Sequence, residues 1–165
     1  MIFWVPILSY VAVLLVTALS YSRAAPPRGP GLLAKLLLRY VCLFPVGLMG
    51  LWAALGHIMF PARSAAGIGW ATSPFQIEVG AANLGIGLAG LIGAFYPNWG
   101  FRLAVAVMTA GFLGGAAVNH LIEIAEAGNY AAGNAGPILY TDVLTPLLLL
   151  ILLALTYRSG RAASA

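Results

Sequence analysis

The chain has 165 residues, of which 62% are hydrophobic and only 7% are charged, with 8 basic and 4 acidic side chains. Soluble domains carry about 25% charged residues, so this composition excludes a soluble enzyme and a disordered tail. The Lys and Arg residues are scattered singly, which excludes the basic stripe of a nucleic-acid-binding protein. The single cysteine, Cys42, excludes a disulfide framework and a multi-cysteine metal centre. We therefore expect the lipid bilayer to be the surroundings of this chain.

Five apolar windows follow one another along the chain, each long enough to cross a bilayer as an α-helix. A hydrocarbon core of about 30 Å takes about 20 apolar helical residues. The windows run roughly over Ile2–Tyr21, Tyr40–Phe60, Ile77–Phe95, Phe101–Ile122 and Ile138–Tyr157. No strand-like alternation competes with them. The sequence thus predicts an all-α polytopic membrane bundle, one domain over residues 1–165, with a four-helix core plus an N-terminal helix.

The first span has two interpretations. Ala24 and Ala25 follow it, as small residues follow a cleaved signal peptide. A signal peptide, however, begins with a positively charged region, and Met1–Tyr10 carries no side-chain charge. A retained helix is therefore favoured.

The second span has a basic amphipathic lead-in. Lys35 and Arg39 lie four residues apart, on one face of a helix over Leu32–Arg39. This pattern is typical of a helix at the level of the lipid headgroups. Pro45 is expected to kink the span that follows without ending it.

The cations give an orientation when the spans are threaded alternately through a membrane. Only Arg63 falls on one side. The other side receives Arg23, Arg28, Lys35, Arg39, Arg102, Arg158 and Arg161. Because cytoplasmic loops are enriched in Lys and Arg, the N-terminus is predicted to be extracytoplasmic and the C-terminus cytoplasmic.

The same threading gathers all the acidic and imidazole side chains on the outer side. They are His57, Glu78, His120, Glu123, Glu126 and Asp142. These residues lie at the outer ends of the second to fifth spans, so their side chains converge if the spans form one bundle. Ionisable residues inside membrane proteins are functional candidates by default.

Small residues share helical faces with three of these polar residues. Gly47, Gly50 and Ala54 lead to His57; Ala81, Ala82, Gly85 and Ala89 share the face of Glu78; and Gly111, Gly115 and Asn119 lead to Glu123. Small residues at this spacing let membrane helices approach closely. We therefore expect these polar side chains to stand on helix-contact faces.

The charge on the outer side is unbalanced. A carboxylate costs about 2.5–3.5 kcal/mol at the centre of a membrane helix. Four acids against Arg63, with both histidines neutral, leave a formal charge of −3. Shared protons, protonated histidines, Arg63 or a bound metal cation would each supply positive charge.

A metal site is one hypothesis for this cluster. His120 and Glu123 lie three residues apart, and pairs of this kind supply ligands in carboxylate-bridged metal sites of helix bundles. The ligand set would be His57, Glu78, His120, Glu123 and Asp142, supported by Asn83, Asn119 and Asn134. Nitrogen and oxygen donors of this kind suit a divalent Zn, Fe or Mn ion.

Three other interpretations remain open. The cluster is a structural hydrogen-bond network, or it belongs to a small transporter or proton-coupled permease that uses Glu78 or Asp142 as a relay. Alternatively, the chain is a non-catalytic subunit or assembly factor that binds partners through its small-residue faces, in a homo-oligomer or in a larger membrane complex. No nucleophile with its base, no phosphate loop and no haem motif is recognisable, so the residues identify no catalytic site.

Three sequence blocks carry a resemblance to a known family. They are SPFQIEVGAANLGIGLAGL at 73–91, GAAVNHLIE at 115–123 and GNAGPILYTDVLTP at 133–146. Together they resemble a family of small bacterial integral membrane proteins of unknown function and are distantly similar to DoxX-like four-helix membrane proteins. The resemblance implies a bacterial inner-membrane location and a polar set of Glu78, Asn83, His120, Glu123, Asn134 and Asp142. The DoxX-like similarity implies redox or quinone-associated work.

Overall fold

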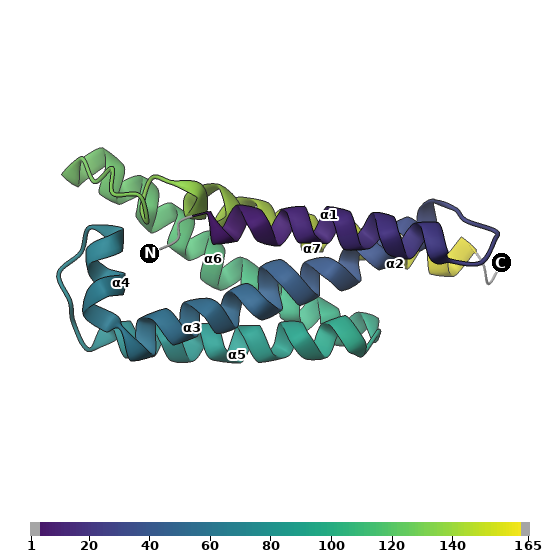
Figure 1. Ribbon diagram of the computed structural model, residues 1–165, viewed down its shortest axis with the longest axis horizontal. Helices are drawn as coiled ribbons and strands as arrows, with labels where there is room; N and C mark the ends of the chain where they lie inside the picture. Colours follow the sequence, from purple (N-terminus) through teal and green to yellow (C-terminus); the bar gives the residue numbers. More distant parts are fainter. Residues whose placement is uncertain (1–3, 163–165) are drawn as a thin grey trace.

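The computed structural model describes residues 4–162, which contain helices and connecting segments and no strand (Figure 1). The helices are α1 (Val5–Arg23), α2 (Pro30–Val41), η1 (Cys42–Leu48), α3 (Met49–Met59), α4 (Pro61–Ile68), α5 (Phe75–Phe95), α6 (Trp99–Ala127) and α7 (Pro137–Ala162). Ile2 and Phe3, at the start of the predicted first span, lie outside the described residues, and so do the side chains of Arg158 and Arg161.

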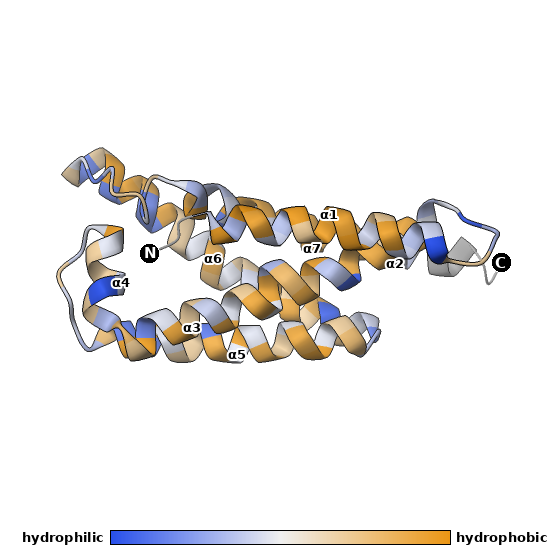
Figure 2. Ribbon diagram, in the orientation of Figure 1, coloured by the Kyte–Doolittle hydropathy of each residue, from blue (hydrophilic) through white to orange (hydrophobic). Residues whose placement is uncertain are grey.

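Five helical segments are long and apolar enough to cross a membrane, which confirms the predicted fold class. They are Val5–Arg23, Pro30–Met59, Phe75–Phe95, Trp99–Ala127 and Pro137–Tyr157. The helices are largely hydrophobic along their length, while strongly polar residues occur on α4 and near helix ends (Figure 2). The chain is thus a multi-pass membrane protein by helix length and composition.

The second span differs from its prediction. We expected Leu32–Arg39 to form an interfacial helix, but α2, η1 and α3 follow one another as a single segment. Leu38 on α2 is 1% exposed and belongs to the same buried cluster as Leu149 and Leu153 of α7. Burial of this apolar face places α2 inside the bundle. Pro45, which lacks an N–H group, lies in the π-helical segment η1, and the helix continues beyond it as predicted.

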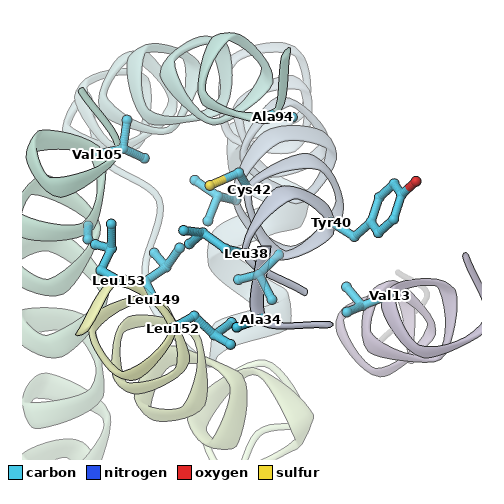
Figure 3. Close-up of a cluster of buried hydrophobic side chains, with 13 residues drawn as sticks. Val13, Ala34, Leu38, Tyr40, Cys42, Ala94, Val105, Leu149, Leu152 and Leu153 are labelled. Atoms are coloured by element: carbon cyan, nitrogen blue, oxygen red, sulfur yellow. The ribbon is translucent and has the colours of Figure 1, made fainter. Parts of the chain in front are cut away.

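A cluster of buried apolar side chains fills the half of the bundle that α2 and the second half of α7 form (Figure 3). Leu38, Leu149 and Leu153 are each at most 2% exposed. The α5–α6 connection is fixed at this end, because Arg102 Nε donates a hydrogen bond of 2.7 Å to the Gly93 carbonyl oxygen. This half of the bundle therefore holds the buried apolar core.

Glycines set the close approach of α3 and η1 to α5. A Cβ atom added to Gly50 would lie 2.7 Å from the Cα atom of Gly87, and one added to Gly90 would lie 2.7 Å from the backbone nitrogen of Gly47. No other residue type fits backbones at this separation. The face that leads from Gly47 and Gly50 to His57 is thus a helix-contact face, as predicted.

The opposite face of α5, which carries Glu78, is largely exposed, although we expected it to be a helix-contact face. Glu78, Ala81, Ala82 and Gly85 are exposed, whereas Ala89, which shares the predicted face, is half-buried and packs against the apolar cluster. The contact with α3 and η1 uses the face that carries Gly80, Gly87 and Gly90 instead. Backbone contact at glycine is closer than contact at alanine, which decides between two faces that both carry small residues.

Helix α6 diverges from α5 toward the end of the bundle that carries α4 (Figure 1). Helix α3 packs along α5 and α6 packs along α7, whereas α5 and α6 share a smaller contact. A Cβ atom added to Gly111, Gly114 or Gly115 of α6 would meet no atom within 4 Å. The expectation that Gly111 and Gly115 form a helix contact is therefore wrong, and these glycines border open space.

Candidate functional site

A cavity of about 570 Å³ lies between the α3–α5 and α6–α7 pairs, next to α4. We call it the main cavity. Its aromatic lining comprises Trp52, Phe60, Trp70, Phe75 and Phe112. Its polar lining includes His57, Arg63, Asn83, Asn119, His120 and Asp142. Most of the wall is apolar, so the few polar groups fix where a hydrogen-bonding group of a guest molecule can lie.

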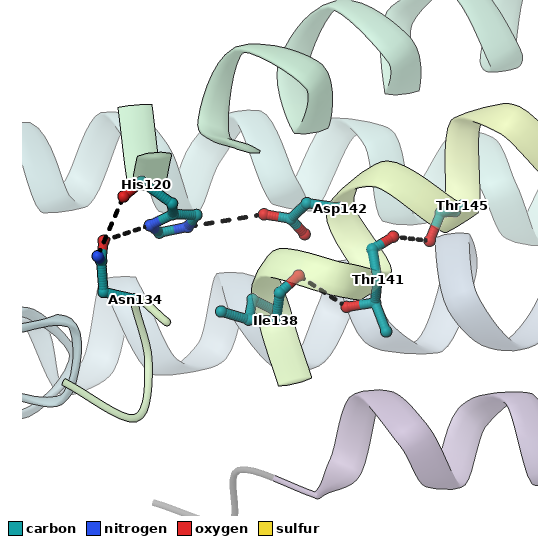
Figure 4. A network of polar contacts seen from close by, with 6 residues as sticks. All are labelled: His120, Asn134, Ile138, Thr141, Asp142 and Thr145. Atoms are coloured by element: carbon teal, nitrogen blue, oxygen red, sulfur yellow. Dashed lines mark hydrogen bonds and ion pairs between the residues drawn. The ribbon is translucent and has the colours of Figure 1, made fainter. Parts of the chain in front are cut away.

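Asn134 orients the His120 ring at the wall of this cavity (Figure 4). Its Nδ2 atom donates hydrogen bonds to the carbonyl oxygens of Asn129, at 2.8 Å, and His120, at 3.2 Å. The Asn134 Oδ1 atom is therefore an acceptor, and it lies 2.6 Å from His120 Nδ1. That ring nitrogen must carry the hydrogen. In a neutral imidazole, the Nε2 atom of His120 is then left as an acceptor.

Asp142 faces this acceptor from α7. Its Oδ2 atom lies 3.7 Å from His120 Nε2, beyond hydrogen-bond distance. The residue is only 4% exposed, and among residues 4–157 no donor is within hydrogen-bond distance of its carboxylate. A buried carboxylate without a donor is costly. The two groups are therefore poised to accept a proton, a cation or a hydrogen-bond donor from a ligand.

The Trp70 ring stacks against the His120 ring. The two ring centroids are 6.4 Å apart, with the planes inclined by 27°. The Trp70 Nε1 atom is buried and has no hydrogen-bond partner among the described residues. The segment after α4 thus helps to hold the imidazole and leaves one donor available near the main cavity.

A second imidazole lies on the α3–α5 wall. The Nδ1 atom of His57 lies 2.6 Å from Oε1 of Gln76, whose side chain is 2% exposed. This contact joins the end of α3 to the first turn of α5. His57 is therefore held by an amide and not by a carboxylate.

Glu123 is hydrogen-bonded to Asn129 and not to His120 or Asp142. Its Oε2 atom accepts a hydrogen bond of 3.2 Å from Asn129 Nδ2, which also donates to the Ile68 carbonyl oxygen at 3.0 Å. The end of α6 is thereby tied to α4. Glu126, which follows on α6, is exposed.

A smaller chamber of about 60 Å³ adjoins the main cavity, and Asn83 and Asp142 line both spaces. We call it the inner chamber. Thr109 also lines it, and its fully buried Oγ1 atom has no hydrogen-bond partner among the described residues. The Tyr10 and Thr145 hydroxyls, 2.6 Å apart, complete a polar side. The chamber is large enough for ordered water and offers it several partners.

The structure brings together only part of the predicted site. His120, Asp142 and Asn134 form one network, and His57, Asn83 and Asn119 line the same main cavity. Glu78 is exposed, and Glu123 is bonded to Asn129. Over the described residues, no three His, Cys, Asp or Glu side chains are grouped closely enough to hold a metal ion. Binding of a metal by the predicted set stays a prediction.

Several residues of the site were missing from the sequence prediction. Gln76 is polar within an apolar window and precedes Glu78 by two residues, so its type and position were a usable signal. Trp70 and Thr109 had no such signal, because aromatic and threonine residues are common in membrane helices and their connections. Their roles follow from the path of the chain around α4 and α6.

Comparison with known protein families gives a match for this chain. A model described as a family of unknown function (DUF6790) matches residues 3–162. The chain belongs to this family. No curated protein and no solved structure matches the chain. DUF6790 membership agrees with the expected uncharacterised family, while the similarity to DoxX-like proteins and the bacterial inner-membrane location stay predictions.

Proposed function

We propose that this protein binds a small, largely apolar molecule from the bilayer in the main cavity, with the polar group of that molecule at the His120–Asp142 pair. The observation that carries the proposal is a buried carboxylate without a donor on the wall of an apolar cavity of about 570 Å³. Ligand sites in proteins commonly measure about 300–1,000 Å³ and combine apolar walls with a few convergent polar groups.

The rim of the cavity supports access from the lipid. Leu55, Phe60 and Phe75 line the main cavity and are 58%, 56% and 62% exposed, respectively. On a membrane-spanning bundle, exposed apolar side chains contact acyl chains. The open space beside Gly115 on α6 adds to this entrance. A lipid-soluble ligand would reach the pair without crossing water.

The structure favours binding over transport. A permease requires a route through the other half of the bundle, where Leu38, Leu149 and Leu153 are buried in the apolar cluster. Asp142 would be the relay in such a route, and besides the main cavity it lines the inner chamber of about 60 Å³. We therefore place transport, and the role of a non-catalytic subunit, behind ligand binding.

Two glycines provide a matched test. A Cβ atom added to Gly115 or to Gly85 would meet nothing within 4 Å, but only Gly115 lines the main cavity. We expect Gly115→Leu to block the cavity and Gly85→Leu to leave it open, with both variants folded. Native mass spectrometry of the purified proteins should detect a bound small molecule on the wild type and on Gly85→Leu, with at least about tenfold lower occupancy on Gly115→Leu. Equal occupancy on the two variants, or a wild type without a bound molecule, would refute the proposal.

A divalent Zn, Fe or Mn ion is a second candidate ligand, supported by the orientation of His120. Its Nδ1–H group is bonded to the Asn134 amide, which is how metal-binding histidines are commonly held, and Nε2 faces Asp142. The protein would supply these two of the five predicted ligands, and the bound molecule or water would supply the others.

Metal titration tests this candidate. At a free Zn²⁺ or Mn²⁺ concentration of about 100 times Kd, binding raises the free energy of unfolding by about 2.7 kcal/mol. We expect His120→Gln to abolish this increase and Glu78→Gln to preserve it, because Glu78 is exposed away from the pair. No stabilisation of the wild type by either ion would remove the metal candidate.

A further inference from the structure

We propose that the ligand presents a hydrogen-bond-donating head group, in the strongest case a protonated amine, to the His120–Asp142 pair. This inference rests on the proposed binding function and specifies the chemical class of the molecule: an alkyl or aryl amine whose apolar body occupies the main cavity. A hydroxyl head group would bind in the same place but more weakly.

The first argument is the number of acceptors that face one another. Asn134 holds the hydrogen of the imidazole on Nδ1, so Nε2 of the neutral ring offers a lone pair. The Asp142 carboxylate offers oxygen lone pairs 3.7 Å away. A donor atom to one side of the line that joins these two acceptors can lie within hydrogen-bond distance of both. An ammonium group, with three N–H donors, can satisfy both at once.

The second argument is the low polarity of the surroundings. Asp142 is 4% exposed, so its interaction with a cation is weakened far less by water than an interaction at the surface. Trp52 and Phe112 are among the rings that line the main cavity. Aromatic faces attract ammonium groups, so the lining suits the same head group.

The alternative is a carboxylate or phosphate head group at Arg63. This residue is the one cation among the described side chains that line the main cavity, apart from its histidines. Arg63 is exposed, however, and an exposed ion pair contributes little because water and salt screen it. Trp70 Nε1 would give such a head group one buried donor. The buried acceptor pair is the stronger determinant of the two.

The test compares three probes with the same chain and different head groups: dodecylamine, dodecanol and dodecanoate. The protein is placed in phosphatidylcholine nanodiscs, because the choline head group has no N–H donor. Tryptophan fluorescence follows binding, since Trp52 and Trp70 line the main cavity. Like lysine, dodecylamine is protonated near neutral pH. We expect its Kd to be about tenfold or more below that of dodecanoate, with dodecanol in between.

Variants test whether the His120–Asp142 pair causes the preference for dodecylamine over dodecanoate. Asp142→Asn replaces a carboxylate oxygen by an amide donor of similar size, and it should reduce the ratio between dodecylamine and dodecanoate to less than about threefold. His120→Gln leaves the Asp142 carboxylate in place. It should lower the affinity for dodecylamine by about threefold and retain the order of affinities of the three probes. Gly115→Leu should weaken all three probes by about tenfold or more, whereas Gly85→Leu should bind them as the wild type does.

The outcomes separate the two proposals. If dodecanoate binds at least as tightly as dodecylamine, or if Asp142→Asn keeps the wild-type ratio, the donor head group is wrong and the cavity function stands. If no probe binds, or if Gly115→Leu binds all three like the wild type, the cavity function itself fails. Addition of phosphatidylethanolamine, whose head group carries an ammonium, then identifies the source: competition with dodecylamine indicates a lipid, and no competition indicates a free amine.

Discussion

His120 Nε2 on α6 and Asp142 Oδ2 on α7 face each other at 3.7 Å, while the other ring nitrogen of His120 is bonded to Asn134. Asn134 belongs to the connection between these two helices. The connection therefore determines the protonated ring nitrogen, and through it the kind of atom that Asp142 faces. A loop residue that is not among those lining the main cavity thus determines which ring nitrogen of His120 faces Asp142 as an acceptor.

Replacement of Asn134 by alanine should destabilise the protein and disturb the site. The change leaves His120 Nδ1–H and the carbonyl oxygens of His120 and Asn129 without their partner in a buried position. We expect a loss of about 1–3 kcal/mol in the free energy of unfolding, measured by chemical denaturation in detergent micelles. Asn119→Ala is the control, because Asn119 is exposed on α6 and should change stability by less than about 0.5 kcal/mol. Equal effects of the two substitutions would contradict the role of Asn134.

Gly87→Ala should destabilise the bundle by separating α5 from α3. A Cβ atom at Gly87 would lie 2.8 Å from the backbone nitrogen of Leu51, and a backbone cannot move aside as a side chain can. Overpacking of this kind costs about 1–3 kcal/mol. Gly85→Ala, on the open face of α5, should be neutral or stabilise the helix by up to about 1 kcal/mol. Thermal unfolding of both variants decides the matter, and a stable Gly87→Ala protein would show that the two helices are not in backbone contact.

The number of the membrane helices could be predicted, whereas the start of the second helical segment and the contact faces of α5 and α6 could not. Hydropathy reports apolar length, and five such segments are present. Both faces of α5 carry small residues, so helical spacing alone could not choose between the Glu78 face and the Gly87 face. The α6 glycines fit a packing pattern equally well, but α6 diverges from α5 and leaves Gly111 and Gly115 beside open space.

The candidate site was predictable only to the level of helix ends. His120 and Asp142 lie near the ends of consecutive spans joined by a short connection, so threading placed them close together. The contribution of Asn134 depends on the conformation of that connection, and the residue type alone suited a turn equally well. The volume of the main cavity depends on the angle between α5 and α6, which no local sequence pattern specifies.

Thr109→Val tests whether water occupies the inner chamber. The Thr109 hydroxyl is fully buried without a protein partner and lines this chamber next to Asp142. If water bonds to it, valine should cost about 1 kcal/mol of unfolding free energy. Thr17→Val is the matched control, because the Thr17 hydroxyl is also buried without a partner but lines neither space. Thr17→Val should leave the free energy of unfolding unchanged or raise it. A stabilising effect at both positions would mean that the inner chamber is dry.

The orientation predicted from the cations can be measured with single cysteines. Cys42 is fully buried, so a Cys42→Ala background removes the native thiol with little change at the surface. Ala66 on α4 and Ser22 near the end of α1 are exposed, at positions that threading assigns to opposite sides of the membrane. We expect a membrane-impermeant maleimide to label Ala66→Cys in intact cells, and to label Ser22→Cys only after permeabilisation, because the basic flanks face the cytoplasm. The reverse pattern would invert the topology and move the opening of the main cavity to the cytoplasmic leaflet. Labelling of both positions from outside would mean that the segment between them, Pro30–Met59, does not cross the membrane, and the alternate threading that puts Asp142 on the outer side would then fail.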